Sequence, residues 1–448
     1  MTEQKLSRVL GFWDVFFIAV GQVIGAGAVA LTGVAIGMTG PGVFLAYICA
    51  ALLALLTSVL AMVAGSALPV IGGYYVWPSR LCGGWLGSIS LFLVLMVCVV
   101  SISLFGKAFG LYLEPVLPFL SQDQWGILMI VVIFLANFFG LKIASRVQMF
   151  LVLIMLSAFA LYAGFAAPEM EVRDLTPVAP NGLMGFLTAV FVLKFATTGA
   201  STIVSLGGEM KNPGRNIPLI MGGATMVVGF IYALISFASI AAVPWQDMVD
   251  QPLTLAGKAF LPGWALTYFL IGGAALALVT TLNASIIQVP RNFMVAAWDQ
   301  LIPPILGKLN RNDVPHFMLI IVLGLGIIPL IAGLEISAIA RAVGIITSFP
   351  TILILWSVMC IPKKFPEAYE KAVFKLSTFW RWFFFIFSTT SVLIGLVILT
   401  QDMTPVVLGA IAISIALSIL YYPVRRAYMR GKGVDLDRRT TSSDIFAH

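Results

Sequence analysis

The sequence predicts an all-α integral membrane protein with twelve transmembrane helices, and three observations support this fold class. The first is composition: of 448 residues, 60% are hydrophobic and only 10% are charged, whereas a soluble protein carries about 25% charged residues. The second is about a dozen apolar runs, each close to the roughly 20 residues that a spanning helix needs. The third is that basic residues gather in alternate loops between the runs. A soluble globular core is therefore excluded.

The apolar runs give the expected spans in chain order. They are 11–38 (interrupted), 41–68, 86–112, 125–141, 147–166, 182–207 (interrupted), 219–242, 265–294, 316–334, 337–360, 380–400 and 404–424. We expect a tail at 1–10, a first five-helix repeat at 11–166, a second, inverted five-helix repeat at 182–360, helices 11 and 12 at 380–424, and a second tail at 425–448.

The basic residues predict the orientation of the chain. Of 26 lysines and arginines, 21 fall in the even-numbered loops and the two tails. The exceptions, three within spans and two in odd-numbered loops, are Lys107, Lys194, Arg341, Arg173 and Lys258. Cytoplasmic loops carry an excess of Lys and Arg, so we expect a multi-pass protein of the inner (plasma) membrane with both termini cytoplasmic. Because the net charge of +7 resides in membrane loops, no nucleic-acid partner is expected.

The first span contains the stretch Gly21-Gln22-Val23-Ile24-Gly25-Ala26-Gly27. Each glycine destabilises a helix by roughly 1 kcal/mol relative to alanine. Freed backbone groups find no water in hydrocarbon, so unwound backbone at this depth occurs where it lines a cavity. The stretch therefore predicts half of a ligand site.

The sixth span has a second interruption, Phe195-Ala196-Thr197-Thr198-Gly199-Ala200-Ser201. It lies five spans after the first one, and the two spans enter the membrane from opposite sides, as an inverted repeat requires. Two interrupted spans in corresponding positions are typical of a transporter with its substrate site at the bilayer midplane. The alternative is that the glycines only let helices pack closely.

Four segments carry a family resemblance. They are Gly21–Gly27, Pro69–Tyr75, Gly208–Pro218, and the stretch from Asn283 through Arg291, Ala296 and Asp299 to Pro303. The first is similar to the family motif Ile-Gly-Ser-Gly-Ile-Phe, and the third is the most specific. On these segments the chain resembles the amino acid–polyamine–organocation permeases, which share the inverted-repeat fold of sodium-coupled leucine transporters.

The resemblance implies an alternating-access carrier for amino acids or close derivatives. It implies that backbone N–H groups in the first interruption hold the substrate carboxylate, that carbonyls in the second receive its ammonium group, and that Phe195 is an aromatic gate. A helix end with unpaired N–H groups attracts an anion, which agrees with this reading. The expected substrate-binding residues are Val23, Ile24, Gly25, Ala26, Gly27, Phe195, Ala196, Thr198, Gly199 and Ser285.

The sequence departs from the family pattern at three positions. Ala26 stands where the family often has serine, and Ser201 stands where it commonly has glutamate. Proton-coupled members resemble one another in a lysine on helix five, and that position here is Met155. The usual coupling residue is therefore absent.

Lys194 is the one basic residue expected near the midplane. It lies about 11 residues into the sixth span, roughly 16 Å deep at the helical rise, and a charge at that depth marks function by default. Three interpretations stay open: it changes protonation during transport, it pairs with an anionic group of the substrate, or it is a structural cation at the helix break. Lys194, Phe195, Asp14 and Glu209 are the expected coupling or gating residues.

The distribution of acidic residues predicts the substrate class. No Asp or Glu lies in the middle third of any span, so a polyamine or a cationic side chain would lack a counter-charge. We therefore favour a neutral or acidic amino acid, carried by proton-coupled symport or exchange. An uncoupled exchanger is one alternative, and sodium coupling is another because Thr280, Thr281 and Ser285 offer oxygen ligands near the first interruption.

Other classes of protein fit the sequence less well. An enzyme would need a catalytic cluster such as paired carboxylates or a His-rich metal motif, and the spans contain none. The paired interruptions do not suggest the continuous water path of a channel. We expect no cofactor and no metal site. The expected partners are an amino acid-like substrate, a proton or a sodium ion, and the lipid bilayer, with the protein a monomer or a homodimer.

Overall fold

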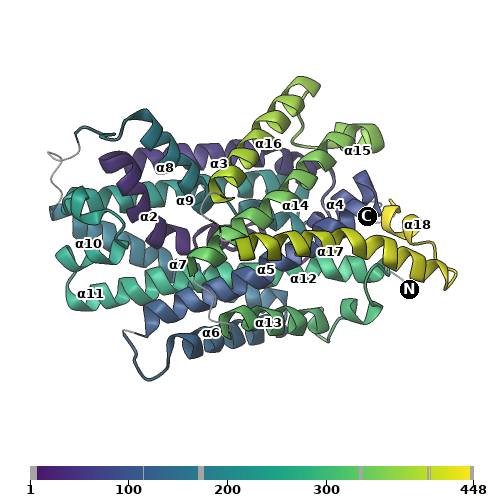
Figure 1. Ribbon diagram of the computed structural model, residues 1–448, viewed down its shortest axis with the longest axis horizontal. Coiled ribbons are helices and arrows are strands. Elements are labelled where there is room, and N and C mark those ends of the chain that lie inside the picture. The colour runs from purple at the N-terminus through teal and green to yellow at the C-terminus, as the bar shows by residue number, and fades with distance from the viewer. Residues whose placement is uncertain are drawn as a thin grey trace.

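The apolar runs form a bundle of helices (Figure 1). A computed structural model describes residues 8–114, 116–169, 176–331, 336–400, 403 and 405–443. Within these ranges there are helices and two isolated bridges but no strands. Eight of the described helices are long and apolar enough to cross a membrane. The observation fits a multi-pass membrane protein.

Every expected span corresponds to one or more helical elements. They are α1 (Phe12–Val23) and α2 (Ala26–Thr39), α3 (Val43–Ala67), α5 (Gly84–Leu113), α6 (Gln122–Phe138), α7 (Leu141–Ala166), α8 (Gly182–Thr197) and η4 (Ala200–Ser205), α9 (Pro213–Ala242), α11 (Gly263–Tyr268), η6 (Phe269–Ala275) and α12 (Leu276–Trp298), α13 (His316–Ile331), α14 (Ile336–Lys364), α16 (Thr378–Thr400) and α17 (Pro405–Arg430). The connecting elements are η1 (Gly40–Gly42), α4 (Gly73–Cys82), η2 (Ala167–Glu169), η5 (Trp245–Met248), α10 (Leu253–Phe260), η7 (Pro304–Gly307), α15 (Pro366–Lys371) and α18 (Leu436–Thr441).

Several helices extend beyond the expected spans, and the eighth and twelfth spans are examples. The eighth span is longer than expected and contains η6, a seven-residue π-helical stretch between α11 and α12. The twelfth span continues to Arg430, beyond the expected end at 424. An apolar run marks the part of a helix that lies in hydrocarbon, whereas the helix itself continues until its hydrogen bonds end.

The core of the bundle lies where α3 packs along α9. The rings of Tyr47 and Tyr232 are fully buried there, with centroids 5.2 Å apart. The Tyr47 hydroxyl hydrogen-bonds Thr32 of α2 at 2.7 Å, and the Tyr232 hydroxyl donates to the carbonyl of Val23 at 3.4 Å. These bonds satisfy two buried hydroxyls and fix α2 and the end of α1 to the core.

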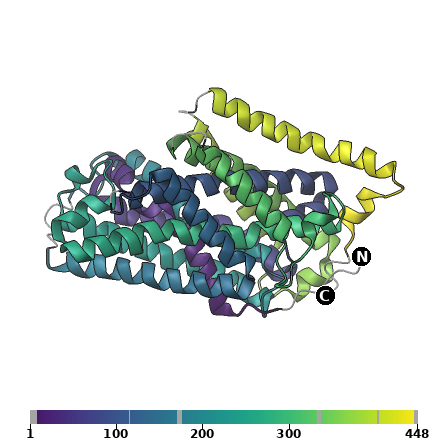
Figure 2. The ribbon, with the colours of Figure 1, turned by 90° about the horizontal axis from the view of Figure 1, so that it is seen from below.

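The last helices lie at the edge of the bundle. Figure 2 shows α17 in yellow along the upper edge, beside the rest of the molecule. Many apolar side chains of α16 and α17 are exposed, including Phe379, Ile386, Leu417 and Val424. Exposed apolar faces on long apolar helices are typical of contact with lipid.

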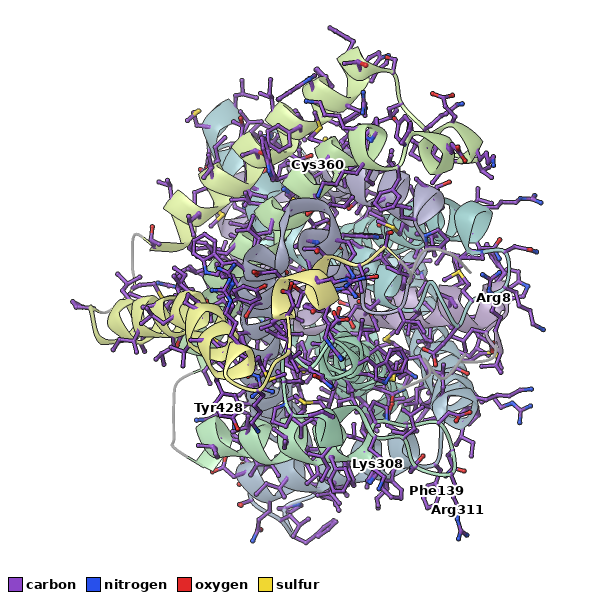
Figure 3. The ribbon with its side chains drawn as sticks, turned by 90° about the vertical axis from the view of Figure 1, so that its right-hand side faces the viewer. Arg8, Phe139, Lys308, Arg311, Cys360 and Tyr428 are labelled. Atoms are coloured by element: carbon purple, nitrogen blue, oxygen red, sulfur yellow. The ribbon has the colours of Figure 1, made fainter. Side chains whose placement is uncertain are left out.

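One end of the bundle carries α4, α15 and α18, at the right in Figure 1, and we call it the α4/α18 end. Figure 3 looks onto this end, with α18 in yellow across its middle and Arg8, Lys308 and Arg311 toward its rim. The side chain of Leu436 on α18 is buried, and the carbonyl of Thr440 accepts a hydrogen bond from Arg80 Nη1 at 2.7 Å. The sequence places Arg80 in a loop, but it lies in the short buried helix α4.

Candidate functional site

The first helix breaks at Ile24 and Gly25. α1 ends at Val23 and α2 begins at Ala26, and both intervening residues have extended backbone conformations. The first N–H groups of α2 lack carbonyl partners within their own helix. The break therefore presents backbone donors at the place where the sequence predicts them.

The α1 break packs against α12 through Thr281. The Thr281 hydroxyl donates toward the carbonyls of Gly21 at 3.0 Å and Ile24 at 2.9 Å, and Ala277 of its own helix offers a third at 2.9 Å. A hydroxyl has one hydrogen, so it cannot satisfy all three carbonyls at once. Three carbonyl oxygens thus converge on one side chain, and a Cβ on Gly25 would lie 3.0 Å from the same hydroxyl.

The second helix breaks at Thr198 and Gly199. α8 ends at Thr197, and Gly199 has φ +143°, a conformation that favours glycine. The Thr198 hydroxyl donates to the carbonyl of Lys194 at 2.6 Å, and Thr202 donates to Gly199 at 2.7 Å. These hydroxyls satisfy carbonyls that the helix end leaves open.

The two breaks lie side by side. A Cβ built on Gly199 would lie 3.1 Å from the backbone oxygen of Gln22, next to the first break. The Gln22 amide also lies 3.4 Å from the Ser285 hydroxyl of α12. Gln22 was not among the expected site residues, although a polar residue between apolar neighbours in an interrupted span was a signal for it.

The structure describes some of the expected binding residues in full and others by their backbone only. The backbone of residues 23–27 and of Thr198 and Gly199 lies at the breaks, Ala196 is buried nearby, and Ser285 reaches Gln22. The side chains of residues 26–30 and of Phe195 lie outside the described part of the chain, so the aromatic gate stays a prediction. Ser201 pairs with Tyr74 of α4, hydroxyl to hydroxyl, at 3.4 Å.

Asn283 takes part in a buried amide network rather than in either break. Its Nδ2 donates to Gln148 Oε1 on α7 at 2.7 Å, and its Oδ1 accepts from Asn137 of α6 at 2.7 Å. Gln148 in turn donates to the carbonyl of Thr280 at 3.0 Å. The network joins α6, α7 and α12, and nothing in the spacing of these residues along the chain predicts it.

The side chain of Lys194 forms a hydrogen bond with another helix, α16. Its ammonium donates to the Ser391 hydroxyl on α16 at 2.6 Å. Met155, at the position where the family resemblance implies a lysine in proton-coupled members, is fully buried, and its sulfur lies 3.9 Å from the Thr280 hydroxyl. Lys194 therefore lies beside the second break in sequence, and its side chain contacts α16.

The two acidic candidates have different positions. Asp14 accepts a hydrogen bond from the N–H of Gly11 at 2.8 Å and so caps the first turn of α1. Glu209 is buried and pairs with Arg291 of α12 at 2.5 Å. The Arg291 guanidinium also donates to the carbonyl of Ile287. Glu209 is thus one half of a buried ion pair, Asp14 caps a helix, and a gating role for either stays a prediction.

Further contacts join elements at the α4/α18 end. The N–H of Leu10 donates to the Glu209 carbonyl at 3.0 Å. Arg80 forms a second buried ion pair, with Asp299, at 2.5 Å. Burial and the Asp299 carboxylate raise the pKa of Tyr75, whose neutral hydroxyl donates to Asp299 at 2.6 Å. This end is therefore bridged by buried charges and backbone bonds together.

An all-helical bundle with two adjacent interrupted helices defines the class of protein as a multi-pass membrane transporter, and comparisons with known proteins agree. The family model described as "Amino acid permease" matches residues 10–428. The chain belongs to the amino acid permease family, within the amino acid–polyamine–organocation superfamily. Its relatives are named permeases and transporters, so it is a transporter rather than an enzyme.

Three curated relatives illustrate the range. The branched-chain amino acid permease BcaP of Bacillus subtilis is 24% identical, over 82% of this chain and 83% of that protein. Cationic amino acid transporter 1 of Arabidopsis thaliana is 25% identical, over 69% of the chain and 55% of the relative. Cationic amino acid transporter 4, vacuolar, of the same plant is 28% identical, over 69% and 56%. The matched segment spans just over half the length of each plant relative.

Proposed function

We propose that the protein is a secondary active transporter that moves amino acids or close derivatives across the cytoplasmic membrane by alternating access. The observation that carries the proposal is the contact between the two helix breaks, at Gln22 and Gly199. Unwound backbone inside a membrane protein supplies both donors and acceptors to a ligand. Twelve spans, a five-plus-five inverted repeat over 11–166 and 182–360, and cytoplasmic termini belong to the same proposal.

The two ends of the substrate would bind different backbone groups. The N–H groups at Ile24 to Gly27 would hold the carboxylate at the positive end of α2. Carbonyls near Phe195 to Thr198 would receive the ammonium group at the negative end of α8. Phe195 would cover the bound ligand, with Ala196, Gly199, Val23 and Ser285 around it.

A neutral or acidic amino acid is the favoured substrate. Neither Gly21–Gly27 nor Phe195–Ser205 contains an Asp or Glu, so a cationic side chain would find no counter-charge there. The name of BcaP, a branched-chain permease, agrees with a neutral substrate. The plant relatives are named for cationic amino acids, which makes lysine the informative competitor.

A thermal-stability screen tests the substrate proposal. A ligand that binds only the folded state stabilises it by mass action, by about 2.7 kcal/mol at 100 times its Kd, and so raises the melting temperature. Purified protein should be stabilised by leucine or glutamate, with and without sodium, and less by putrescine. Stabilisation by putrescine and by no amino acid would overturn the substrate class, and labelled counterflow in proteoliposomes would separate a carrier from a channel.

The proposed energy source is a proton gradient, coupled to transport through Lys194. Replacing Lys194 with methionine removes the charge and keeps the length of the side chain. Uptake by Lys194→Met should therefore lose its response to an imposed pH gradient, measured in proteoliposomes. Lys258→Met is the matched control, because Lys258 lies on the short helix α10. An unchanged pH dependence together with unchanged selectivity would contradict both functional roles of Lys194.

Sodium coupling is the second candidate, and the surroundings of Thr281 favour it. Hard cations need several oxygen ligands, and the Thr281 hydroxyl stands among the carbonyls of Gly21, Ile24 and Ala277. Under proton coupling, sodium should leave substrate binding unchanged in the wild type and in Thr281→Val. Sodium-dependent stabilisation of the wild type that disappears in Thr281→Val would decide for sodium instead.

A further inference from the structure

Below the first break, α12 carries a row of polar side chains. Ser285, Gln288 and Asn292 are three and four residues apart, so they share one face of the helix. Gln22 Oε1 lies 3.4 Å from the Ser285 hydroxyl and 3.5 Å from Gln288 Nε2. Asn292 Nδ2 donates to the Ser205 hydroxyl of η4 at 3.3 Å. The row therefore faces the last turn of α1 and the segment after the second break.

Two acceptors in this row have no partner. Gln288 and Asn292 are 2% and 1% exposed, and neither Gln288 Oε1 nor Asn292 Oδ1 accepts a hydrogen bond from any described residue. Buried polar groups are nearly always paired, and an exception indicates a missing donor. Two such acceptors one helical turn apart indicate a place for one donor group or for the waters that replace it.

The row connects the paired breaks with the α4/α18 end. It begins at Gln22, whose backbone oxygen would lie 3.1 Å from a Cβ on Gly199. It ends at Asn292, next to Arg291, whose ion pair with Glu209 helps to bridge that end. A ligand that left the breaks toward the α4/α18 end along this face of α12 would pass Ser285, Gln288 and Asn292.

We propose that Gln288 and Asn292 form a release subsite that receives the ammonium group of the substrate on this route. The inference rests on the proposed function, because it needs a substrate in the breaks. An ammonium group has three donors and no acceptor, which matches two unpaired amide oxygens beside the Ser285 hydroxyl. A carboxylate offers acceptors only and would leave both amide oxygens unsatisfied. The subsite thus selects primary amines, and it handles the substrate end opposite to the one held by α2.

The first experiment separates binding from release. Gln288→Leu and Asn292→Leu are reconstituted, and leucine is the probe for thermal stabilisation and for counterflow. Each variant should bind leucine within about twofold of the wild type and exchange it about tenfold more slowly, because one hydrogen bond to a charged group is lost. Thr39→Val is the matched control: Thr39 is also buried with an unpartnered hydroxyl, but it lies at the end of α2. Its exchange rate should be unchanged.

A second variant keeps the proposal testable if Gln288→Leu and Asn292→Leu do not fold. Gln288→Glu preserves the size of the side chain and an acceptor oxygen while it adds a negative charge. It should raise the apparent affinity for leucine and slow its exchange, each by about tenfold, because the carboxylate holds the α-ammonium group more strongly than an amide does. Unchanged leucine affinity together with unchanged exchange in Gln288→Glu would overturn the subsite.

The failures of the subsite and of the proposed function are distinguishable. If the wild type binds leucine and both Gln288→Leu and Asn292→Leu exchange it at the wild-type rate, the subsite alone is overturned. A wild type that binds no amino acid overturns the proposed function and the subsite with it.

Discussion

Gly21→Val is expected to abolish exchange, with a loss of at least about 100-fold. A Cβ at this position would lie 1.9 Å from Gln148 Nε2 and 3.0 Å from both Thr280 Cβ and Val152 Cγ2. Gln148 cannot retreat freely, because its amide donates to the Thr280 carbonyl and accepts from Asn283. Overpacking costs about 1–3 kcal/mol, and α1 must shift away from α12 just before its break.

The measurements are leucine counterflow and the melting temperature. Gly164→Val is the matched control, because Gly164 lies in α7 and an added Cβ there meets no described atom within 4 Å apart from its chain neighbours and the backbone of its own helix. That variant should exchange at the wild-type rate. Equal activity of the two variants would contradict the packing of the α1 break against α7 and α12.

Glu209→Ala is expected to lower the free energy of unfolding by about 3–5 kcal/mol, because it leaves a buried guanidinium without its counter-charge. Arg291 and Glu209 are both buried, and the guanidinium lies within α12 beside Ile287. The double variant Glu209→Leu, Arg291→Met removes both charges, so it should recover most of the lost stability. Transport by the double variant should stay impaired if the pair is a gate.

The control for this prediction is an exposed pair. Lys375 and Glu370 lie 2.8 Å apart with side chains 44% and 74% exposed. Glu370→Ala should change the free energy of unfolding by less than about 1 kcal/mol. A melting temperature of Glu209→Ala as close to the wild type as that of Glu370→Ala would show that the buried pair is not needed to hold this end together.

The sequence was sufficient for the approximate positions of the long apolar helices and of the two helix breaks. Apolar runs and clustered glycines are local signals, and the α1 break falls inside the predicted stretch Gly21–Gly27. The sequence was not sufficient for contacts between segments that are distant along the chain. Lys194 donates to Ser391, and Arg80 donates to the carbonyl of Thr440. Such pairs depend on how helices pack, and no spacing within one helix encodes them.

Polar residues in apolar runs show the same limit. Asn283 is polar within the eighth apolar run, yet its amide belongs to the network with Asn137 and Gln148 rather than to either break. Gln22 is not among the expected site residues, although its backbone oxygen lies close to Gly199 of the second break. Sequence identifies which side chains need a buried partner, whereas the direction of each side chain decides whether that partner is a ligand or another helix.

The docking of α18 affects where the chain can be shortened or fused for biochemical work. The family match ends at residue 428, so a boundary drawn from homology would remove Leu436–Thr441. Such a truncation would uncover the surface beneath Leu436 and take one acceptor from Arg80. A protein made for biochemical work should therefore include the chain through residue 443, with any purification tag or fusion partner placed after it.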